Sequence, residues 1–312
     1  MTSQNVAADG LPTPRRYWAI VSIGLGITLA VLDGAIANVA LPSIAQDLQA
    51  SAAASIWIVN AYQIAIVVAL LPLASLGEIV GYRRVSQVGL AVFTLASLAC
   101  ALSDSILTLS LARVLQGFGA AGIMSVNGAL VRFTYPQRML GRAVGINAVI
   151  VSMAAAAGPT IASAILSVGE WRWLFALNIP LGVLAVSMAG FTLPHNPLHK
   201  RRLNIVGALL SAAAFGFVIT GMQALAHGEA SIFGFGLTGL GLAAGVLLVR
   251  HEKPSKTPLI PLDLLARPMF ALSVATSIIS FTAQMMAFVA LPFFLQGSLG
   301  PVSYTHLRAH ET

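Results

Sequence analysis

Residues 17–42 read YWAIVSIGLGITLAVLDGAIANVALP, and Asp33 carries the only charged side chain in this run. A helix needs about 20 mostly apolar residues to cross a bilayer, so the stretch is long enough to span one. No A-x-A-like cleavage site follows the run, which is longer than a signal-peptide core. We therefore predict an uncleaved first membrane helix after a cytoplasmic N-terminus, residues 1–16. Arg15 and Arg16 also resemble a twin-arginine export signal, which is the alternative interpretation.

The rest of the chain repeats this apolar pattern. Of its 312 residues, 57% are hydrophobic and only 9% are charged, whereas soluble domains carry roughly 25% charged residues. A water-soluble fold could not cover its surface with so few charges. The sequence predicts an all-α polytopic membrane protein with about nine transmembrane helices. We place them near residues 17–40, 54–74, 86–103, 105–131, 142–167, 173–193, 204–225, 231–249 and 269–292.

The basic residues predict the orientation of these helices. The net charge of +7 would suit a nucleic-acid partner, but the charges sit in short clusters between apolar runs. Such clusters are typical of cytoplasmic loops beside a lipid bilayer, so we expect no nucleic-acid partner. If the N-terminus is cytoplasmic, every second loop is basic. The residues on that side are then Arg15, Arg16, Arg83, Arg84, Arg132, Arg138, Arg142, Lys200, Arg201, Arg202, Arg250, Lys253, Lys256 and Arg267.

Breaks in the apolar rhythm predict the domain organisation. The basic, proline-containing segment 194–203 reads as a cytoplasmic linker that closes a six-helix bundle, residues 17–203. Two extra helices follow in residues 204–250, and residues 251–300 begin another bundle with one helix. Residues 301–312, PVSYTHLRAHET, look like translated sequencing-adapter sequence, and we interpret them as a non-native tail. The alternative is an ordinary polar C-terminus.

An aspartate inside a membrane helix is the strongest functional signal. Its insertion costs about 2.5–3.5 kcal/mol, so Asp33 needs a partner, water or a proton. Arg113, in the segment RVLQGFGAAG, lies inside the fourth helix. Counting at 1.5 Å per residue places each group about 13 Å below the outer surface. We therefore expect an ion pair in which Asp33 carries a transported proton and Arg113 modulates it. The alternative for each residue is a purely structural role.

The loop between the second and third helices, ASLGEIVGYRR (74–84), is a candidate gate. Gly77 and Gly81 permit tight turns. Glu78 can form a charge relay with Arg83 or Arg84 that latches one conformation and releases in another. The alternative is that the arginines only anchor the loop on the cytoplasmic side.

The fifth helix contains AAAAGPTIASA (154–164). Its small side chains allow close helix packing, and Pro159 removes a backbone hydrogen bond. Gly158 and Pro159 are therefore a candidate hinge, although simple small-residue packing explains the pattern equally well.

Further polar and aromatic side chains lie within the predicted helices. They are candidates to line a substrate cavity, with interhelical hydrogen bonding as the alternative. They are Asn38, Trp57, Asn60, Tyr62, Gln63, Gln116, Asn127, Asn147 and Gln284. The segment WRWLFALNIPLG (171–182) follows the fifth helix, and its tryptophans suit an aromatic belt at the outer interface.

Enzyme signatures are absent from the sequence. It has no H-E-x-x-H, P-loop, G-x-S-x-G or cysteine pair, and its six histidines have no acidic partners at metal-ligand spacing. We expect neither an enzyme nor a metal site.

Taken together, these segments resemble the major facilitator superfamily, and more narrowly its fourteen-helix drug:proton antiporters. LDGAIANVALP (32–42) and RVLQGFGAAG (113–122) are similar to the family's first-helix and fourth-helix signatures, and WRWLFALNIPLG is similar to a segment typical of the fourteen-helix branch. The loop 74–84 departs from its signature, since Ala74, Glu78 and Ile79 replace a glycine, an aspartate and an arginine. The fifth-helix signature keeps Gly158 and Pro159 but has lost its flanking glycines.

The resemblance implies alternating access, with about nine of an expected fourteen helices present in a C-terminally truncated chain. It implies proton-coupled export of drugs or similar small amphipathic molecules across a bacterial cytoplasmic (inner) membrane. The proton gradient would supply the energy, and no cofactor is expected. Whether a periplasmic adaptor takes part stays open. The alternatives are a facilitator-fold transporter of another small solute, such as a metabolite, sugar or siderophore, and a non-functional or scaffolding membrane fragment.

Overall fold

A computed structural model describes residues 9–196, 198, 203–226, 231–254, 259, 264 and 266–299. The chain falls into two compact units, Met1–Leu259 and Ile260–Thr312. The described part of the first unit consists of helices joined by connections without regular structure. They are α1 (Arg15–Asp47), α2 (Ala52–Val80), α3 (Tyr82–Ala101), α4 (Ile106–Thr134), the 3₁₀ turn η1 (Gln137–Met139), α5 (Leu140–Val168), α6 (Arg172–Ala176), α7 (Asn178–Thr192), α8 (Ile205–Ala226) and α9 (Ser231–Glu252). The second unit contributes α11 (Pro268–Leu299).

Local sequence signals explain where several helices begin and end. Ser51 caps α2 by accepting a hydrogen bond of 3.2 Å from the backbone of Ala54, and Ser105 forms a capping box at the start of α4. Gly81 separates α2 from α3 with φ +107°, in the region that favours glycine. Helix α4 ends one residue before Tyr135, which is followed by Pro136 and has an extended backbone.

Eight helical segments of the described chain are long and apolar enough to cross a membrane, counting α6 and α7 as one segment, Arg172–Thr192. They coincide with the first eight predicted helices, which confirms a polytopic all-α membrane protein. The ninth predicted segment, 269–292, lies within α11. Whether it crosses a membrane, and the total of nine out of fourteen, stay predictions, as do the predicted domain boundaries. The predicted tail 301–312 lies outside the described residues.

The sixth predicted helix differs from the expectation in one detail. It is divided at Leu177 into the short α6 and the longer α7. Proline has no backbone N–H, so Pro180 cannot bond to the carbonyl group of Ala176 four residues earlier. The helical ladder is therefore interrupted just where Asn178 begins α7.

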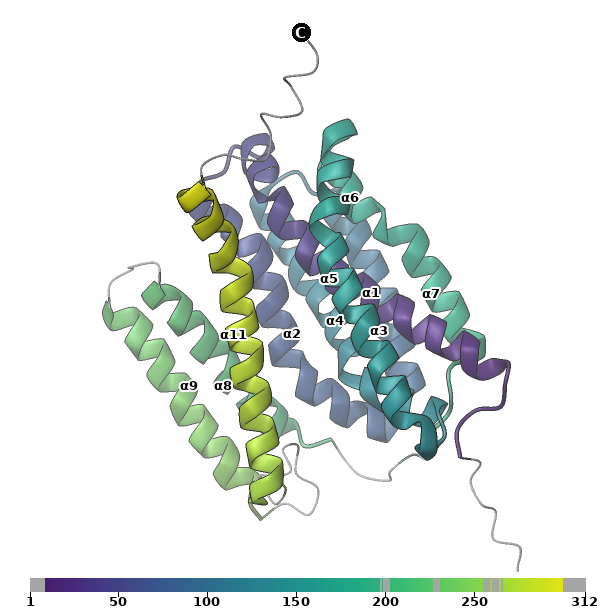
Figure 1. Ribbon diagram of the computed structural model, residues 1–312. Helices are drawn as coiled ribbons and strands as arrows, with labels where there is room; N and C mark the ends of the chain where they lie inside the picture. Colours follow the sequence, from purple (N-terminus) through teal and green to yellow (C-terminus); the bar gives the residue numbers. More distant parts are fainter. Residues whose placement is uncertain are drawn as a thin grey trace, which may run out of the picture. The chain divides into compact units, whose positions relative to one another are not determined.

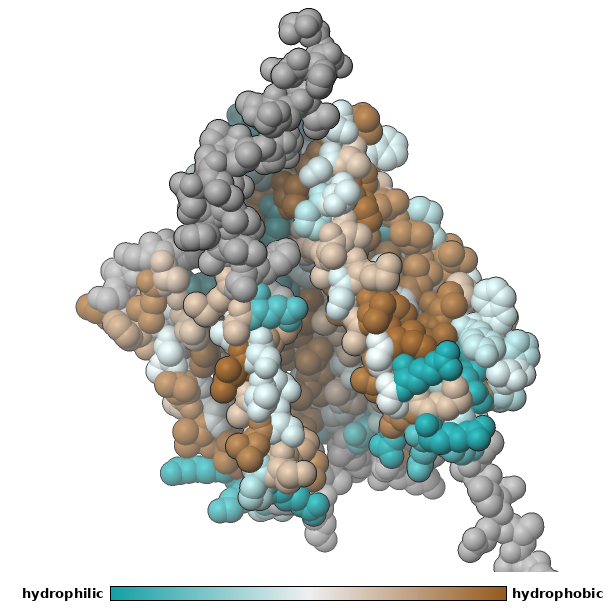
Figure 2. All heavy atoms as spheres, viewed as in Figure 1, coloured by the Kyte–Doolittle hydropathy of each residue, from teal (hydrophilic) through white to brown (hydrophobic). Residues whose placement is uncertain are grey.

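Helix α1 lies at the centre of the first unit and contacts α2, α4, α5 and α7 (Figure 1). Helix α3 packs on α4 and α7, while α8 and α9 pair with each other and α8 also contacts α2. Figure 2 shows hydrophobic residues over the middle of α5 and α7, with hydrophilic residues gathered near the start of α1. A surface of this kind suits contact with lipid.

Side chain to backbone hydrogen bonds identify which helix ends share a face of the bundle. Arg15 donates to the carbonyl groups of Thr192 and Leu193, and Arg83 donates to that of Gly190. The start of α1, the start of α3 and the end of α7 therefore lie together. Three of the predicted cytoplasmic segments meet at this end, which we call the basic end. Its location on the cytoplasmic side stays a prediction.

Candidate functional site

Asp33 of α1 and Arg113 of α4 form an ion pair inside the bundle, between Oδ2 of the carboxylate and Nη1 of the guanidinium. Both side chains are almost completely buried, with exposed fractions of 1% and 0%. The predicted pairing of these residues is therefore present in the structure. Removing two charges from water costs several kcal/mol per ion, so such a pair persists only if further polar groups satisfy it.

Two amides complete the environment of the carboxylate. Oδ1 of Asp33 accepts hydrogen bonds from Gln116 Nε2 at 2.9 Å and from Asn178 Nδ2 at 2.7 Å. Gln116 lies one helical turn beyond Arg113 on α4, whereas Asn178 is the first residue of α7. Both are buried. The carboxylate thus receives donors from α4 and α7, and these hydrogen bonds offset part of the hydration it loses on burial.

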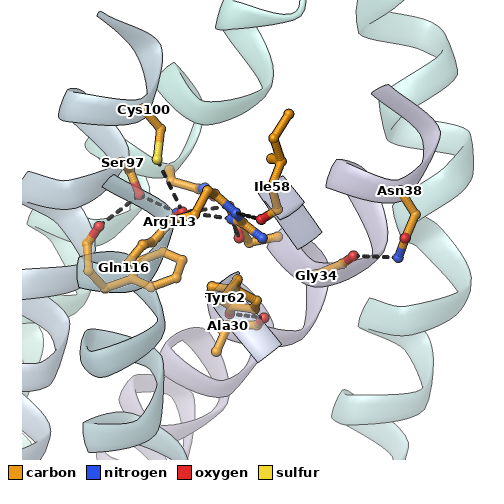
Figure 3. Close-up of polar contacts among 12 residues, drawn as sticks. Ala30, Gly34, Asn38, Ile58, Tyr62, Ser97, Cys100, Arg113 and Gln116 are labelled. Atoms are coloured by element: carbon orange, nitrogen blue, oxygen red, sulfur yellow. Dashed lines mark hydrogen bonds and ion pairs between the residues drawn. The ribbon is translucent and has the colours of Figure 1, made fainter. Parts of the chain in front are cut away.

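The guanidinium group of Arg113 is held by α2 as well. Its Nε donates to the carbonyl group of Ile58 at 3.2 Å, and its Nη1 also donates to Gln116 Oε1 at 2.7 Å (Figure 3). The Tyr62 ring lies 4.0 Å from the Arg113 Cζ atom and the Phe175 ring lies 5.6 Å from it. Aromatic rings stack well on a guanidinium, so these contacts offset part of its lost hydration.

The network extends from Gln116 to α3. Gln116 Nε2 donates to Ser97 Oγ at 2.9 Å, and the Cys100 thiol donates to Gln116 Oε1 at 3.4 Å (Figure 3). Tyr62 is fixed separately, because its hydroxyl donates to the carbonyl group of Ala30 at 2.8 Å. Side chains from α1, α2, α3, α4 and α7 thus form one buried cluster, which we call the Asp33 network.

Two buried atoms of the Asp33 network have no hydrogen-bond partner among the described residues. They are Nη2 of Arg113, a donor, and Oδ1 of Asn178, an acceptor. Leaving a buried polar atom unpaired costs about 1–3 kcal/mol. The Asp33 network therefore contains one unpaired donor and one unpaired acceptor among the described residues.

The candidate hinge on α5 lies directly against α1. A Cβ atom added to Gly158 would stand 2.5 Å from the Cβ of Ala35, so only glycine allows this approach. Pro159 lies inside the continuous helix α5. Because Ala35 is two residues from Asp33, the α5 contact is next to the ion pair along α1. The structure gives the contact, while hinge motion stays a prediction.

The candidate gating loop lies at the basic end. Arg83 is directed to the end of α7, where it contacts Gly190 and where its Nη1 lies 2.9 Å from His195 Nε2. Arg84 is exposed, and Glu78 lies near the end of α2. A Cβ added to Gly77 would meet Tyr82 at 2.6 Å. The loop is therefore tied to α7, a contact that the predicted relay did not include.

The structure does not bring all the candidate cavity residues to one place. Tyr62 and Gln116 belong to the Asp33 network, whereas Asn127 donates to Asn147 at 3.2 Å, a bond between α4 and α5. Asn38 folds back on its own helix and donates to the carbonyl group of Gly34 at 3.0 Å (Figure 3). On α2, Asn60 is half-buried and Trp57 and Gln63 are exposed, and Gln284 is exposed on α11.

Asn178, Ser97 and Cys100 were not among the predicted site residues. The sequence held one signal for Asn178, since it is a polar residue inside an apolar segment. A second contact that the sequence did not predict lies at the C-terminal end of α1. There Asp47 accepts from Trp171 Nε1 and Arg172 Nη1, both at 2.9 Å, which joins the predicted aromatic belt to α1.

Comparison with known proteins identifies the family to which the sequence is similar. Residues 23–305 match the model of a family described as Major Facilitator Superfamily. The chain is 53% identical over 297 residues to "Uncharacterized transporter YebQ" of Escherichia coli, covering 95% of this chain and 65% of the relative. It is 31% identical to "Multidrug resistance protein Stp" of Mycobacterium tuberculosis, covering 90% and 53%.

"Riboflavin transporter RibZ" of Clostridioides difficile is 28% identical, with 90% of this chain and 61% of the relative covered. The chain thus spans between about half and two thirds of the length of these relatives.

Proposed function

The chain belongs to the Major Facilitator Superfamily, and from that premise we propose that it is part of a proton-coupled exporter of drugs or similar amphipathic small molecules in a bacterial cytoplasmic membrane. The buried ion pair of Asp33 and Arg113 carries this proposal. In a membrane interior, an ionisable residue held by partners from several helices is a strong candidate for a proton relay.

The proposed coupling follows from the bonds of the Asp33 carboxylate. When it is ionised, it accepts from Arg113, Gln116 and Asn178, which belong to α4 and α7. When it takes up a proton, it loses the charge that holds Arg113. The guanidinium is then buried without a counter-ion, an arrangement that costs about 3–5 kcal/mol. Protonation at Asp33 thereby favours a second arrangement of the helices, in which Arg113 and Asn178 find other partners.

The same step gives exchange of a proton for substrate. Asp33 is 1% exposed here, so its proton can enter or leave only when the helices move. A cationic substrate that approached Asp33 in another conformation would compete with both the proton and Arg113 for the carboxylate. Competition for one carboxylate couples the export of the substrate to the import of a proton.

The name of RibZ supports a second candidate, a transporter of a different small solute. The two proposals share the fold and differ in the cargo. The same assay separates them, because a solute transporter without drug efflux leaves the accumulation of a cationic dye unchanged.

The test is the accumulation of ethidium in cells that express the complete coding sequence, since the relatives are longer than this chain. We expect expression to lower ethidium accumulation several-fold, and an uncoupler that collapses the proton gradient to restore it. Asp33→Asn should abolish the effect. Asp104→Asn, which changes an exposed loop carboxylate, is the matched control and should leave it intact. Equal accumulation with and without expression would contradict drug export.

A further inference from the structure

Two cavities of the first unit share a wall at the basic end. One, which we call the polar pocket after the charged and amide-bearing residues around it, is a cavity of about 260 Å³ between the start of α3 and the segment after α7. The other is an apolar groove of about 250 Å³ formed by α2, α3 and α4. Val80 and Arg84 line both cavities. The polar pocket therefore adjoins the apolar groove at these two residues.

Cationic and hydrogen-bonding side chains line the polar pocket. They are Arg83, Arg84, Gln87, His195 and Asn196. Asn196 Oδ1 accepts from the backbone N–H of Tyr82 at 2.8 Å, and this bond fixes the segment after α7 against the first turn of α3. Arg83 is held by Gly190 and His195. The pocket is thus built by contacts between two distant parts of the chain.

Arg84 lies at the junction of the two cavities with an exposed side chain. Within the described part of the chain, its guanidinium has no hydrogen-bond or ion-pair partner. A planar guanidinium binds phosphate oxygens through two parallel N–H donors. Arg84 therefore presents a phosphate-binding group at the point where the apolar groove opens.

The apolar groove faces outward from the helices. It is lined by Leu73, Leu76, Val85, Val88, Val92 and Phe118. Val88 is 62% exposed and Phe118 is 42% exposed, as expected for side chains in contact with lipid. Arg84 and Val92 are about 12 Å apart along α3 at 1.5 Å per residue. This length is close to the hydrocarbon depth of one leaflet, about 15 Å.

We propose that the two cavities together bind one anionic phospholipid, with its phosphate at Arg84 in the polar pocket and one acyl chain along the apolar groove. Charge complementarity selects the head group, because the polar pocket contains two arginines. Basic pockets between membrane helices commonly bind such head groups. The adjoining groove selects a lipid over a soluble phosphate, because only a lipid fills both cavities. This site is separate from the Asp33 network and does not depend on the proposed transport activity.

The test is lipid retention by the purified chain in detergent, measured by native mass spectrometry after addition of dioleoyl phosphatidylglycerol. We expect bound phosphatidylglycerol on the unaltered chain. Arg84→Gln, which removes the phosphate ligand, and Val88→Trp, which fills the groove, should each lower the bound fraction several-fold. Arg84 and Val88 are exposed, so both variants should fold. Arg132→Gln and Leu95→Trp change exposed residues of α4 and α3 that do not line either cavity, and they should retain the lipid like the unaltered chain.

Two further ligands distinguish the sources of the phosphate group. Dioleoyl phosphatidylethanolamine has the same chains without net charge, and glycerol 3-phosphate has the phosphate without the chains. We expect retention of phosphatidylglycerol alone. Retention of phosphatidylethanolamine equal to that of phosphatidylglycerol would overturn the anionic preference. Thermal stabilisation of the chain by glycerol 3-phosphate equal to that by phosphatidylglycerol would overturn the lipid site. Retention by Arg84→Gln and Val88→Trp at the level of their controls would overturn the whole proposal.

Discussion

The amide of Asn178 donates a hydrogen bond of 2.7 Å to the carboxylate of Asp33, although 145 residues separate them in the chain. This bond joins α7, the last helix of the predicted six-helix bundle, to α1, the first. The ion pair to Arg113 joins α1 to α4 at the same carboxylate. One buried acidic group therefore connects the beginning, the middle and the end of the bundle.

Removal of the Asn178 amide should destabilise the bundle. A hydrogen bond to a charged group contributes about 1.5–3 kcal/mol, and Asn178→Leu should lower the free energy of unfolding by that amount. The measurement is equilibrium unfolding of the purified chain in mixed detergent micelles containing increasing SDS. Asn38→Leu is the matched control, because Asn38 is exposed and bonds only to its own helix, and it should have little effect. Equal losses in the two variants would contradict a specific role for Asn178.

A double-mutant cycle on the ion pair should be strongly non-additive. Asp33→Asn alone leaves the Arg113 charge buried, and Arg113→Gln alone leaves the Asp33 charge buried. Each single change should cost about 3–5 kcal/mol. The double variant carries neither of these buried charges. Its loss in free energy of unfolding, measured in the same experiment, should therefore be smaller than the sum of the two single-variant losses. Additive losses would mean that the two charges do not stabilise each other.

The Gly158 contact predicts a size-dependent effect on α5. Gly158→Ala would place a methyl group 2.5 Å from the Ala35 Cβ, and overpacking of this kind costs about 1–3 kcal/mol. Gly145→Ala, on the same helix with open space around it, should be neutral. Adding Ala35→Gly to Gly158→Ala should restore stability. A neutral Gly158→Ala variant would show that α1 and α5 do not pack this closely.

The orientation can be measured with single cysteines. Cys100 is the only cysteine and is buried, so Cys100→Ser gives a background without thiols. In whole cells, a membrane-impermeant maleimide should label Val168→Cys at the end of α5 and leave Arg84→Cys at the basic end unlabelled. Everted vesicles should give the opposite pattern. If Arg84→Cys were labelled in whole cells, the predicted cytoplasmic N-terminus would be wrong.

The apolar pattern and helix geometry explain what could be predicted. Lipid leaves few options for apolar stretches of this length, so eight segments were placed correctly from composition. The Asp33–Arg113 pair followed from depth, because a fixed rise per residue puts both groups at one level. Asn178 could not be found in this way. Its position depends on how α7 packs beside α1, which the local sequence does not determine.

The candidate cavity residues show the same limit. Polar residues in membrane helices can bond to a neighbouring helix, to their own backbone or to a ligand. Asn127 and Asn147 bond to each other, Asn38 bonds to its own helix, and only Tyr62 and Gln116 join the Asp33 network. Helix periodicity alone does not say which of these partners a side chain meets, because that choice depends on the rotation of each helix in the bundle.

Proton movement driven by substrate tests the central claim, that Asp33 carries the coupled proton, most directly. Everted vesicles with the complete protein are given an inside-acidic pH gradient, and a pH-sensitive dye reports its dissipation when ethidium is added. We predict that ethidium discharges the gradient with the unaltered protein and with Asp104→Asn, and that Asp33→Asn abolishes the response. An Asp33→Asn variant that still discharged the gradient at the unaltered rate would contradict the account.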